Sequence, residues 1–172
     1  MLVTLGARRA SVDLVDQLLE CHHRIRRFLA LAGELASRPA LDDTEVQVTA
    51  EQVRRYFAEA LPLHVEDEDE TITATLASAS PVVVAALAQM TREHVEMEPA
   101  IDRLIGVCAE LVREPQRRAT LALGLAALSA ELETRFATHL ALEEGIIFPA
   151  LRALPDQQRE HIRVAMQRRR VG

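Results

Sequence analysis

The sequence is poor in the residues that build β-structure and tight turns. Its 172 residues include no tryptophan, one tyrosine, four phenylalanines and only six glycines, and runs of β-branched residues are scarce. Leucine and alanine dominate instead, together with glutamate, arginine and glutamine, which are good helix formers. With 49% apolar residues, the chain is long enough to bury one sizeable core. This composition predicts an all-α fold.

Three further absences bear on location and partners. No stretch of about 18 apolar residues is present, and the start MLVTLGARRA lacks a long apolar run, so we expect neither a transmembrane helix nor a signal peptide. The formal net charge of −6 disfavours binding to nucleic acid or to an anionic membrane. The two cysteines, Cys21 and Cys108, form no CxxC motif, which indicates unpaired thiols. We therefore expect a cytoplasmic protein, and the sequence names no protein partner.

Proline and glycine divide the chain into long helical segments. The expected helices span about residues 11–37, 43–79, 81–114 and 115–153, with a short fifth helix over about 155–170. Four long helices with short connections predict an antiparallel up-down-up-down four-helix bundle. We expect one domain over residues 1–172, with the bundle at about 11–154 and the fifth helix capping one end.

Two features should disturb these helices. Pro62 removes a backbone donor, so it should kink or split the second helix. Gly145 and Pro149 should distort the end of the fourth. The basic end QRRRVG is interpreted as a solvated helix end.

A weak repeat relates the two halves of the chain. The segments HVEDEDETI (64–72) and HLALEEGII (139–147) share the pattern HxxxExxxI. Another helical histidine, His22 or His94, precedes each of them at a similar distance. Each half therefore resembles a helical hairpin, and two such hairpins would pack into a pseudo-symmetric bundle.

Helical periodicity places histidines and glutamates on the apolar faces. Residues three to seven positions from His22 include Leu18 and Ile25, whereas His23 shares its side with Arg26, so His23 should point outward. The same reasoning places six side chains inward: His22, His64, Glu68, His94, His139 and Glu143. His161, on the last helix, has no comparable carboxylate partner and is expected at the surface.

Metal binding explains these six inward residues better than separate histidine–glutamate pairs do. One HxxxE alone is usually a surface pair worth a few tenths of a kcal/mol. Burying two carboxylates, however, costs several kcal/mol each unless they are compensated. Arg26 is the main inward cation on offer, and neutral imidazoles cannot neutralise the charge, whereas two metal ions can. Imidazole and carboxylate donors suit iron, manganese or zinc, and bundle cores host such sites.

The order of these residues resembles the hemerythrin-like (HHE cation-binding) family. Its pattern is a histidine on helix one, HxxxE on helix two, a histidine on helix three and HxxxE on helix four. The segments LLECHHRIRRFL, TREHVEMEPAIDRL and HLALEEGIIFPAL carry the resemblance, which covers about Val12 to Leu154. It implies two non-haem iron ions joined by an oxo or hydroxo bridge and by Glu68 and Glu143. His22 and His64 would then bind one iron, and His94 and His139 the other.

The resemblance further implies an open coordination position for O2, nitric oxide or peroxide, used in sensing, scavenging or peroxide decomposition. Whether such a centre is an enzyme is left open. Oxygen-carrying members have a fifth histidine one turn after the one on helix three, and their last carboxylate is an aspartate spaced five from its histidine. Here Glu98 takes the position of the fifth histidine, and Glu143 is spaced four from His139. Glu98 is a further candidate ligand or outer acceptor, with a salt bridge to Arg26 as the alternative.

Other functions remain in competition. Ferritin-like di-iron oxidases use ExxH motifs, and no candidate histidine has glutamate three residues earlier. Iron-handling or stress-repair proteins of this superfamily carry a cysteine-containing N-terminal region that is not seen here. A metal-free helical interaction module is the third alternative.

Several neighbouring residues receive lesser roles. Tyr56 is expected in the core, with an outer donor to the metals as the alternative, and Cys21 is not assigned as a ligand because it lies about 100° round the helix from His22. The acidic residues Asp67, Asp69 and Glu144 are expected on the exposed face.

Overall fold

The computed structural model describes residues 13–38 and 40–171, and within them all regular structure is helical, with no strand. The α-helices are α1 (Leu14–Ser37), α2 (Asp43–Arg55), α3 (Leu61–Glu66), α4 (Thr73–Thr75), α5 (Pro81–Arg113), α6 (Arg118–Leu142), α7 (Phe148–Arg152) and α8 (Asp156–Arg169). Between them lie π-helical segments η1 (Tyr56–Ala60), η2 (Asp67–Ile72) and η4 (Glu143–Ile147), and a short 3-10 helix, η3 (Pro115–Arg117). The prediction of an all-α fold is confirmed.

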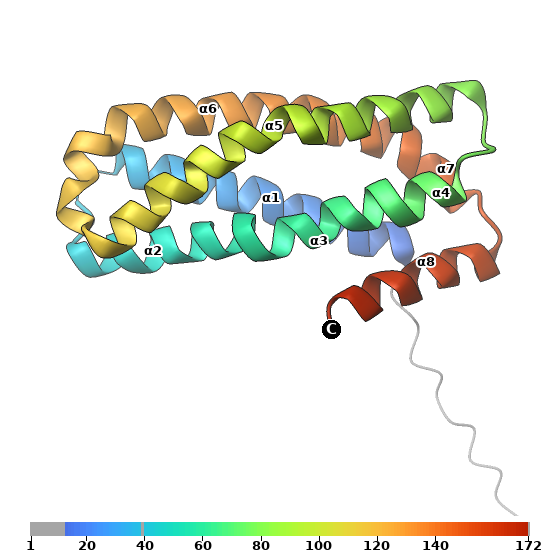
Figure 1. Ribbon diagram of the computed structural model, residues 1–172, viewed down its shortest axis with the longest axis horizontal. Coiled ribbons are helices and arrows are strands. Elements are labelled where there is room, and N and C mark those ends of the chain that lie inside the picture. Colours follow the sequence, from blue (N-terminus) through green and yellow to red (C-terminus); the bar gives the residue numbers. More distant parts are fainter. Residues whose placement is uncertain (1–12, 39, 172) are drawn as a thin grey trace, which may run out of the picture.

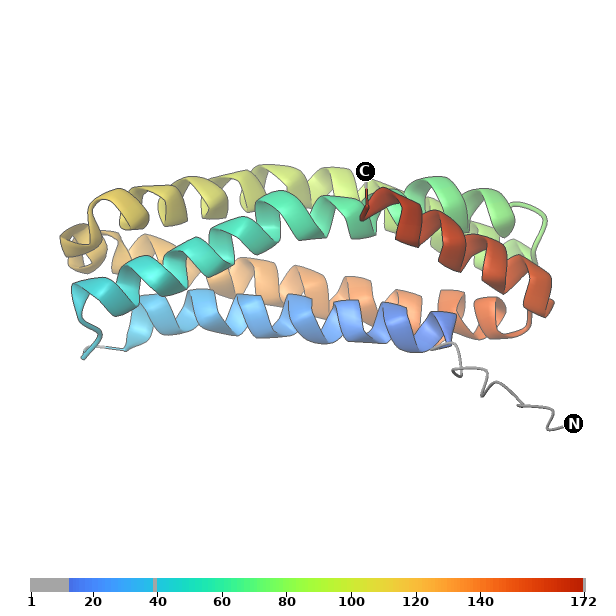
Figure 2. The ribbon, with the colours of Figure 1, turned by 90° about the horizontal axis from the view of Figure 1, so that it is seen from below.

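These elements form four long rods that lie side by side (Figures 1 and 2). The first rod is α1, the second runs from α2 to α4, the third is α5, and the fourth runs from α6 to α7. Successive rods run in opposite directions, and α1 also packs against α6, which closes the bundle.

Local signals set where the rods begin. Asp13 accepts a hydrogen bond from the Val15 N–H at 2.9 Å and so caps α1. Asp42 and Glu45 exchange side-chain to backbone bonds in a capping box at the start of α2. These caps satisfy N–H groups that have no partner inside the helix. The first two residues of the expected helix at 11–37 lie outside the described part.

Proline widens the helices instead of ending them. Just before Pro62 the Leu61 N–H bonds to the Tyr56 carbonyl, and just before Pro149 the Phe148 N–H bonds to the Glu143 carbonyl. Both bonds span five residues, because the proline ring crowds the carbonyl four residues earlier and proline has no N–H. At Pro62 a kink or a split was expected: the second rod is distorted at η1 but continues through it, and the distortion expected near Pro149 is η4.

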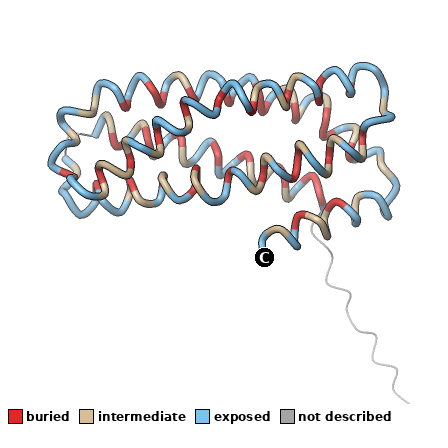
Figure 3. The backbone as a smooth tube through the Cα atoms, in the orientation of Figure 1, coloured by how far each residue is buried: buried red, intermediate tan, exposed pale blue. Residues whose placement is uncertain are grey.

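The core consists of two apolar clusters that are separated along the bundle. One is built around residues such as Ile25, Leu61 and Met97, and the other around residues such as Leu18 and Ile72. In Figure 3 the buried positions follow the inner faces of all four rods. The six inward residues predicted from the sequence fall between the two clusters on every rod. A polar layer thus crosses an otherwise apolar core.

Helix α8 lies against η2 and α1 and buries Ile162 and Met166. The sequence predicted that the basic end of this helix is solvated, but two of its arginines make contacts with the bundle. Arg169 and Arg170 both reach Asp67, at 2.9 and 2.7 Å. Asp67 was expected to be exposed, but it is fully buried, because α8 packs against η2 and the helix end supplies both cations, Arg169 from α8 and Arg170 directly after it. No helix in the described residues is long and apolar enough to cross a membrane.

Candidate metal centre

Six side chains from all four rods meet in the polar layer. They are His22 of α1, His64 of α3, Glu68 of η2, His94 of α5, His139 of α6 and Glu143 of η4. All six are buried, and the two carboxylate residues are at most 1% exposed. Both glutamates lie in π-helical segments, which occur often at functional sites.

The six residues form two groups of potential metal ligands. The first comprises His22, His64, Glu68 and Glu143, and the second comprises Glu68, His94, His139 and Glu143. Within each group, one donor atom per residue lies within 4.8 Å of the others. Glu68 and Glu143 belong to both groups, so the two groups share these carboxylates.

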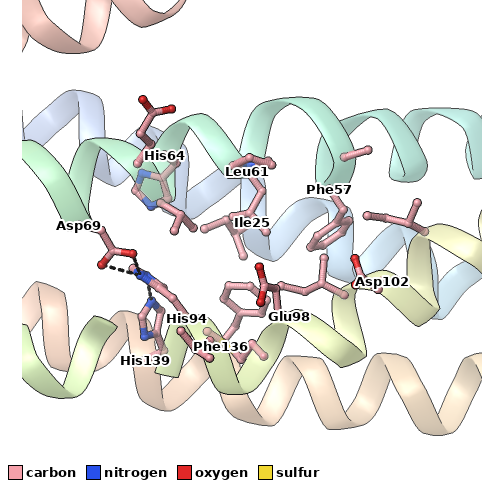
Figure 4. Close-up of a pocket in the computed structure, with 18 of the residues that line it drawn as sticks. Ile25, Phe57, Leu61, His64, Asp69, His94, Glu98, Asp102, Phe136 and His139 are labelled. Carbon is pink, nitrogen blue, oxygen red and sulfur yellow. Dashed lines mark hydrogen bonds and ion pairs between the residues drawn. The ribbon is translucent and has the colours of Figure 1, made fainter. Parts of the chain in front are cut away.

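The imidazole Nε2 atoms all face the central carboxylates. Those of His22 and His139 lie 2.9 and 2.8 Å from the two oxygens of Glu143. Those of His64 and His94 lie 3.3 and 3.4 Å from the two oxygens of Glu68. Nε2 of His94 and Nε2 of His139 approach each other to 3.1 Å (Figure 4).

These short distances do not make a satisfied hydrogen-bond network. All four carboxylate oxygens of Glu68 and Glu143, and Nε2 of His22, lack a hydrogen bond of acceptable geometry among the described residues. Buried polar atoms are normally paired, since an unpaired one costs about 1–3 kcal/mol. Converging donor atoms that do not satisfy one another fit metal ions between them.

Three further carboxylates, outside the central layer, contact the Nδ1 atoms of three of the imidazoles, on the side of the ring away from Nε2. We call them the outer carboxylates. Nδ1 of His22 lies 2.8 Å from Glu144, and Nδ1 of His139 lies 2.9 Å from Glu93. Nδ1 of His94 lies 3.1 Å from both oxygens of Asp69, which also accepts a hydrogen bond from Thr91. Outer carboxylates of this kind orient metal-binding imidazoles and raise their basicity.

The predicted exposure of two of these carboxylates is wrong. Asp69 and Glu144 are only 29% and 32% exposed, because each turns back to bond an imidazole on a neighbouring rod. The sequence reasoning missed Glu93 altogether, because it lies about 100° round the helix from His94 and outside the apolar face. Its only signal is its position directly before an inward histidine.

His64 differs from the other three histidines. Its Nδ1 is buried and has no hydrogen-bond partner among the described residues. Burial lowers the pKa of His64 to about 3. At His94 burial acts in the same direction, but the carboxylates of Asp69 and Glu68 outweigh it and raise the pKa to about 10. The pKa values of His22 and His139 are raised for the same kind of reason, by Glu143 together with Glu144 or Glu93.

The pKa values of the two central carboxylates, Glu68 and Glu143, are shifted in opposite directions. Burial raises the pKa of Glu68 to about 7, and the charge of Glu143 adds to this effect. Burial also opposes ionisation of Glu143, but His139 and His22 outweigh it and lower the pKa. Positive charge beside a buried carboxylate thus favours its ionised form, and metal ions bound in the layer would supply such charge.

The structure does not bring Glu98 into either group. Glu98 is exposed, and Arg26 bonds to Glu144 at 2.8 Å and not to Glu98. Arg26 itself is exposed, so it is not the inward cation that the sequence suggested. Tyr56 is buried as expected, and its hydroxyl donates to the Cys21 carbonyl at 3.4 Å, beside His22.

A cavity of about 540 Å³ opens beside the centre, between the second rod and α5 (Figure 4). His64, His94 and His139 are among the residues that line it. The layer can thus be approached from this side by a small molecule.

The comparison with protein families agrees with this geometry. The family model of the hemerythrin HHE cation binding domain matches residues 13–151, which include all six buried ligand candidates. No curated protein matches the chain.

Proposed function

Because the chain belongs to the hemerythrin HHE cation-binding family, we propose that it is a non-haem di-iron protein that binds or reacts with O2, nitric oxide or peroxide. One observation supports this most strongly: two groups of buried histidine and glutamate donors share both carboxylates. Each ion would receive two imidazoles and two bridging carboxylates. This donor set suits iron, and it also suits manganese or zinc.

The protein's own residues would prepare the site in three ways. Glu68 and Glu143 supply carboxylate oxygens at the centre, and apolar clusters flank the layer on either side along the bundle. Glu144, Asp69 and Glu93 hold the Nδ1 atoms of their imidazoles, which orients Nε2 toward the centre. Bound iron would supply redox chemistry and a coordination position for the small ligand.

Two further observations bear on the location of the protein and on its domain organisation. The two free thiols, Cys21 and Cys108, support a reducing, cytoplasmic location. The packing of α8 against η2 and α1 supports treating the chain as one domain. Sensing, scavenging and peroxide decomposition differ in kinetics, so turnover of peroxide against reversible binding of nitric oxide would distinguish them.

Metal analysis of the purified protein tests the proposal directly. We expect about two iron ions per chain and a near-ultraviolet to visible ferric absorption that changes with azide, peroxide or nitric oxide. A colourless preparation that takes up no metal from ferrous iron would contradict the proposal and would favour a metal-free interaction module.

A matched pair of variants tests the assignment of the ligands. Glu143→Ala should abolish loading of two ions, because Glu143 is shared by both groups. His23→Ala should load normally, because His23 is exposed and belongs to neither group. Equal loading of the two variants, measured by metal analysis per folded chain, would show that the centre lies elsewhere.

A further inference from the structure

The cavity beside the centre is far larger than a diatomic ligand requires. Its volume is about 540 Å³, whereas a molecule the size of water occupies roughly 30 Å³ of liquid. Cavities of a few hundred Å³ are typical binding sites for organic molecules. The size of the cavity therefore points to an occupant beyond O2, nitric oxide or peroxide.

The walls of the cavity combine two kinds of surface. Apolar side chains from all four rods form much of the lining, including Ile25, Phe57, Leu61, Met97 and Phe136. Five carboxylate residues also line it, and no arginine does. An occupant would need an apolar body, and a positive charge would be favoured over a negative one.

Two of the five carboxylates have no partner in the part of the chain that the structure describes. Glu66 and Glu70 pair with Arg169, and Asp69 bonds to His94. Glu98 and Asp102, one turn apart on α5, make no hydrogen bond or ion pair with the described residues. Figure 4 shows both along the cavity, away from His94 and His139. Their charge is available to a bound molecule.

A second, independent observation concerns His64, one of the residues that line the cavity. His64 lines the cavity, is only 4% exposed, and has a buried Nδ1 without a hydrogen-bond partner among the described residues. The other three imidazoles of the layer have an outer carboxylate at this position. Among the three histidines that line the cavity, only His64 has an Nδ1 without a partner among the described residues.

We propose that this cavity binds a small amphiphilic organic cation. Its apolar body lies between the second rod and α5, and its ammonium group lies at Glu98 and Asp102. The site needs the folded bundle but no metal, so it stands or falls separately from the di-iron proposal. The role of Glu98 is then recognition of the ligand and not coordination of iron.

Three probes of equal chain length test the proposal: n-octylammonium, n-octanol and n-octanoate, each below its micelle concentration. Calorimetry with the full chain, as purified and after chelation, should show affinity in the order ammonium, alcohol, carboxylate. Each unpaired carboxylate near the surface should contribute up to about fivefold in affinity. Equal affinity for the ammonium and the carboxylate, or no binding of any probe, would overturn the proposal.

Variants then test where the cation binds. The double variant Glu98→Gln/Asp102→Asn should lose the preference for octylammonium, with octanol binding unchanged. Glu96→Gln is the matched control, because Glu96 lies on the same helix but does not line the cavity. Unchanged octylammonium binding in the double variant would contradict the assignment.

Methionine methyl NMR locates the apolar body of the probe. The Met97 signal should shift on adding octylammonium, because Met97 lines the cavity, whereas that of Met166, buried near α8, should not. A Met97 signal that does not respond would overturn the proposal. So would a concentration-dependent dimer that covers the cavity and excludes all three probes.

Discussion

Each outer carboxylate is the sequence neighbour of a residue in the central layer. Asp69 follows Glu68, Glu93 precedes His94, and Glu144 follows Glu143. Each reaches across to an imidazole on another rod, so one short segment supplies both an inner donor and an outer support. On α1 the neighbours of His22 are Cys21 and His23, neither of which has a carboxylate. By the same pattern a neighbour of His22 on α1 would support His64 on the second rod, and the lack of a carboxylate there explains why His64 alone has no outer carboxylate among the described residues.

Removal of an outer carboxylate should weaken metal binding without removing a ligand. In Glu93→Ala, Nδ1 of His139 loses its partner, and we expect metal affinity to fall about 10- to 100-fold. Competition with a chelator of known affinity measures the change. Glu96→Ala is the control, because Glu96 lies on the same helix and bonds to no described ligand candidate, and its metal affinity should match that of the wild type. An equal loss of affinity in both variants would refute the role of Glu93.

The two cysteines should differ in reactivity. Burial raises the pKa of Cys108 to about 12, so at pH 8 only about one molecule in ten thousand carries the reactive thiolate. Cys21 is only partly buried. Raising the pH from 7 to 9 should therefore leave Cys108 unmodified by iodoacetamide in the folded protein. Mass spectrometry of the peptides should find Cys21 modified first, and early labelling of Cys108 would contradict its burial.

At the scale of elements, the second rod and α8 act together. The π-helical segment η2 contains Glu68, which faces the centre, and Asp67, which faces α8. Arg169 extends the contact to Glu66, Glu70 and the Thr71 hydroxyl. The end of the chain thus covers the back of a segment that presents one of the two shared carboxylates.

Loss of both arginines should destabilise the fold. In Arg169→Ala/Arg170→Ala, the buried carboxylate of Asp67 loses both cations, and we expect a loss of about 3 kcal/mol in the free energy of unfolding. This is the low end of the usual range, because both guanidinium groups keep some contact with water. Urea unfolding measures it. Arg168→Ala, an exposed neighbour, is the control, and equal midpoints in all proteins would show that the contact contributes little.

At the scale of the whole molecule, the polar layer lies between two apolar clusters that do not depend on it. Each cluster takes residues from all four rods. The bundle should therefore persist without metal, although the layer would then hold unsatisfied carboxylate oxygens. Metal would stabilise the fold by binding the native state.

Chelation should lower stability but not helix content. An ion present at about a thousand times its dissociation constant would stabilise the native state by about 4 kcal/mol. Circular dichroism should thus show unchanged helicity at low temperature and a lower Tm after chelation. Identical melting curves before and after verified metal removal would contradict a metal centre within the core.

The sequence by itself determined the helical composition, the inward faces of the four rods and the six residues of the polar layer. It could do so because helical periodicity is local: positions three, four and seven apart share a face whatever the helix packs against. The same argument placed His23 outside, and His23 is exposed.

Only the tertiary structure decided the outer partners, the burial of Asp67 and the place of Glu98. Asp69, Glu93 and Glu144 act on rods other than their own, and Asp67 is buried by a helix about 100 residues further along the chain. Such contacts depend on how rods pack, which a count along one helix does not contain. The cavity likewise exists only between two rods, so no single segment of the sequence describes it.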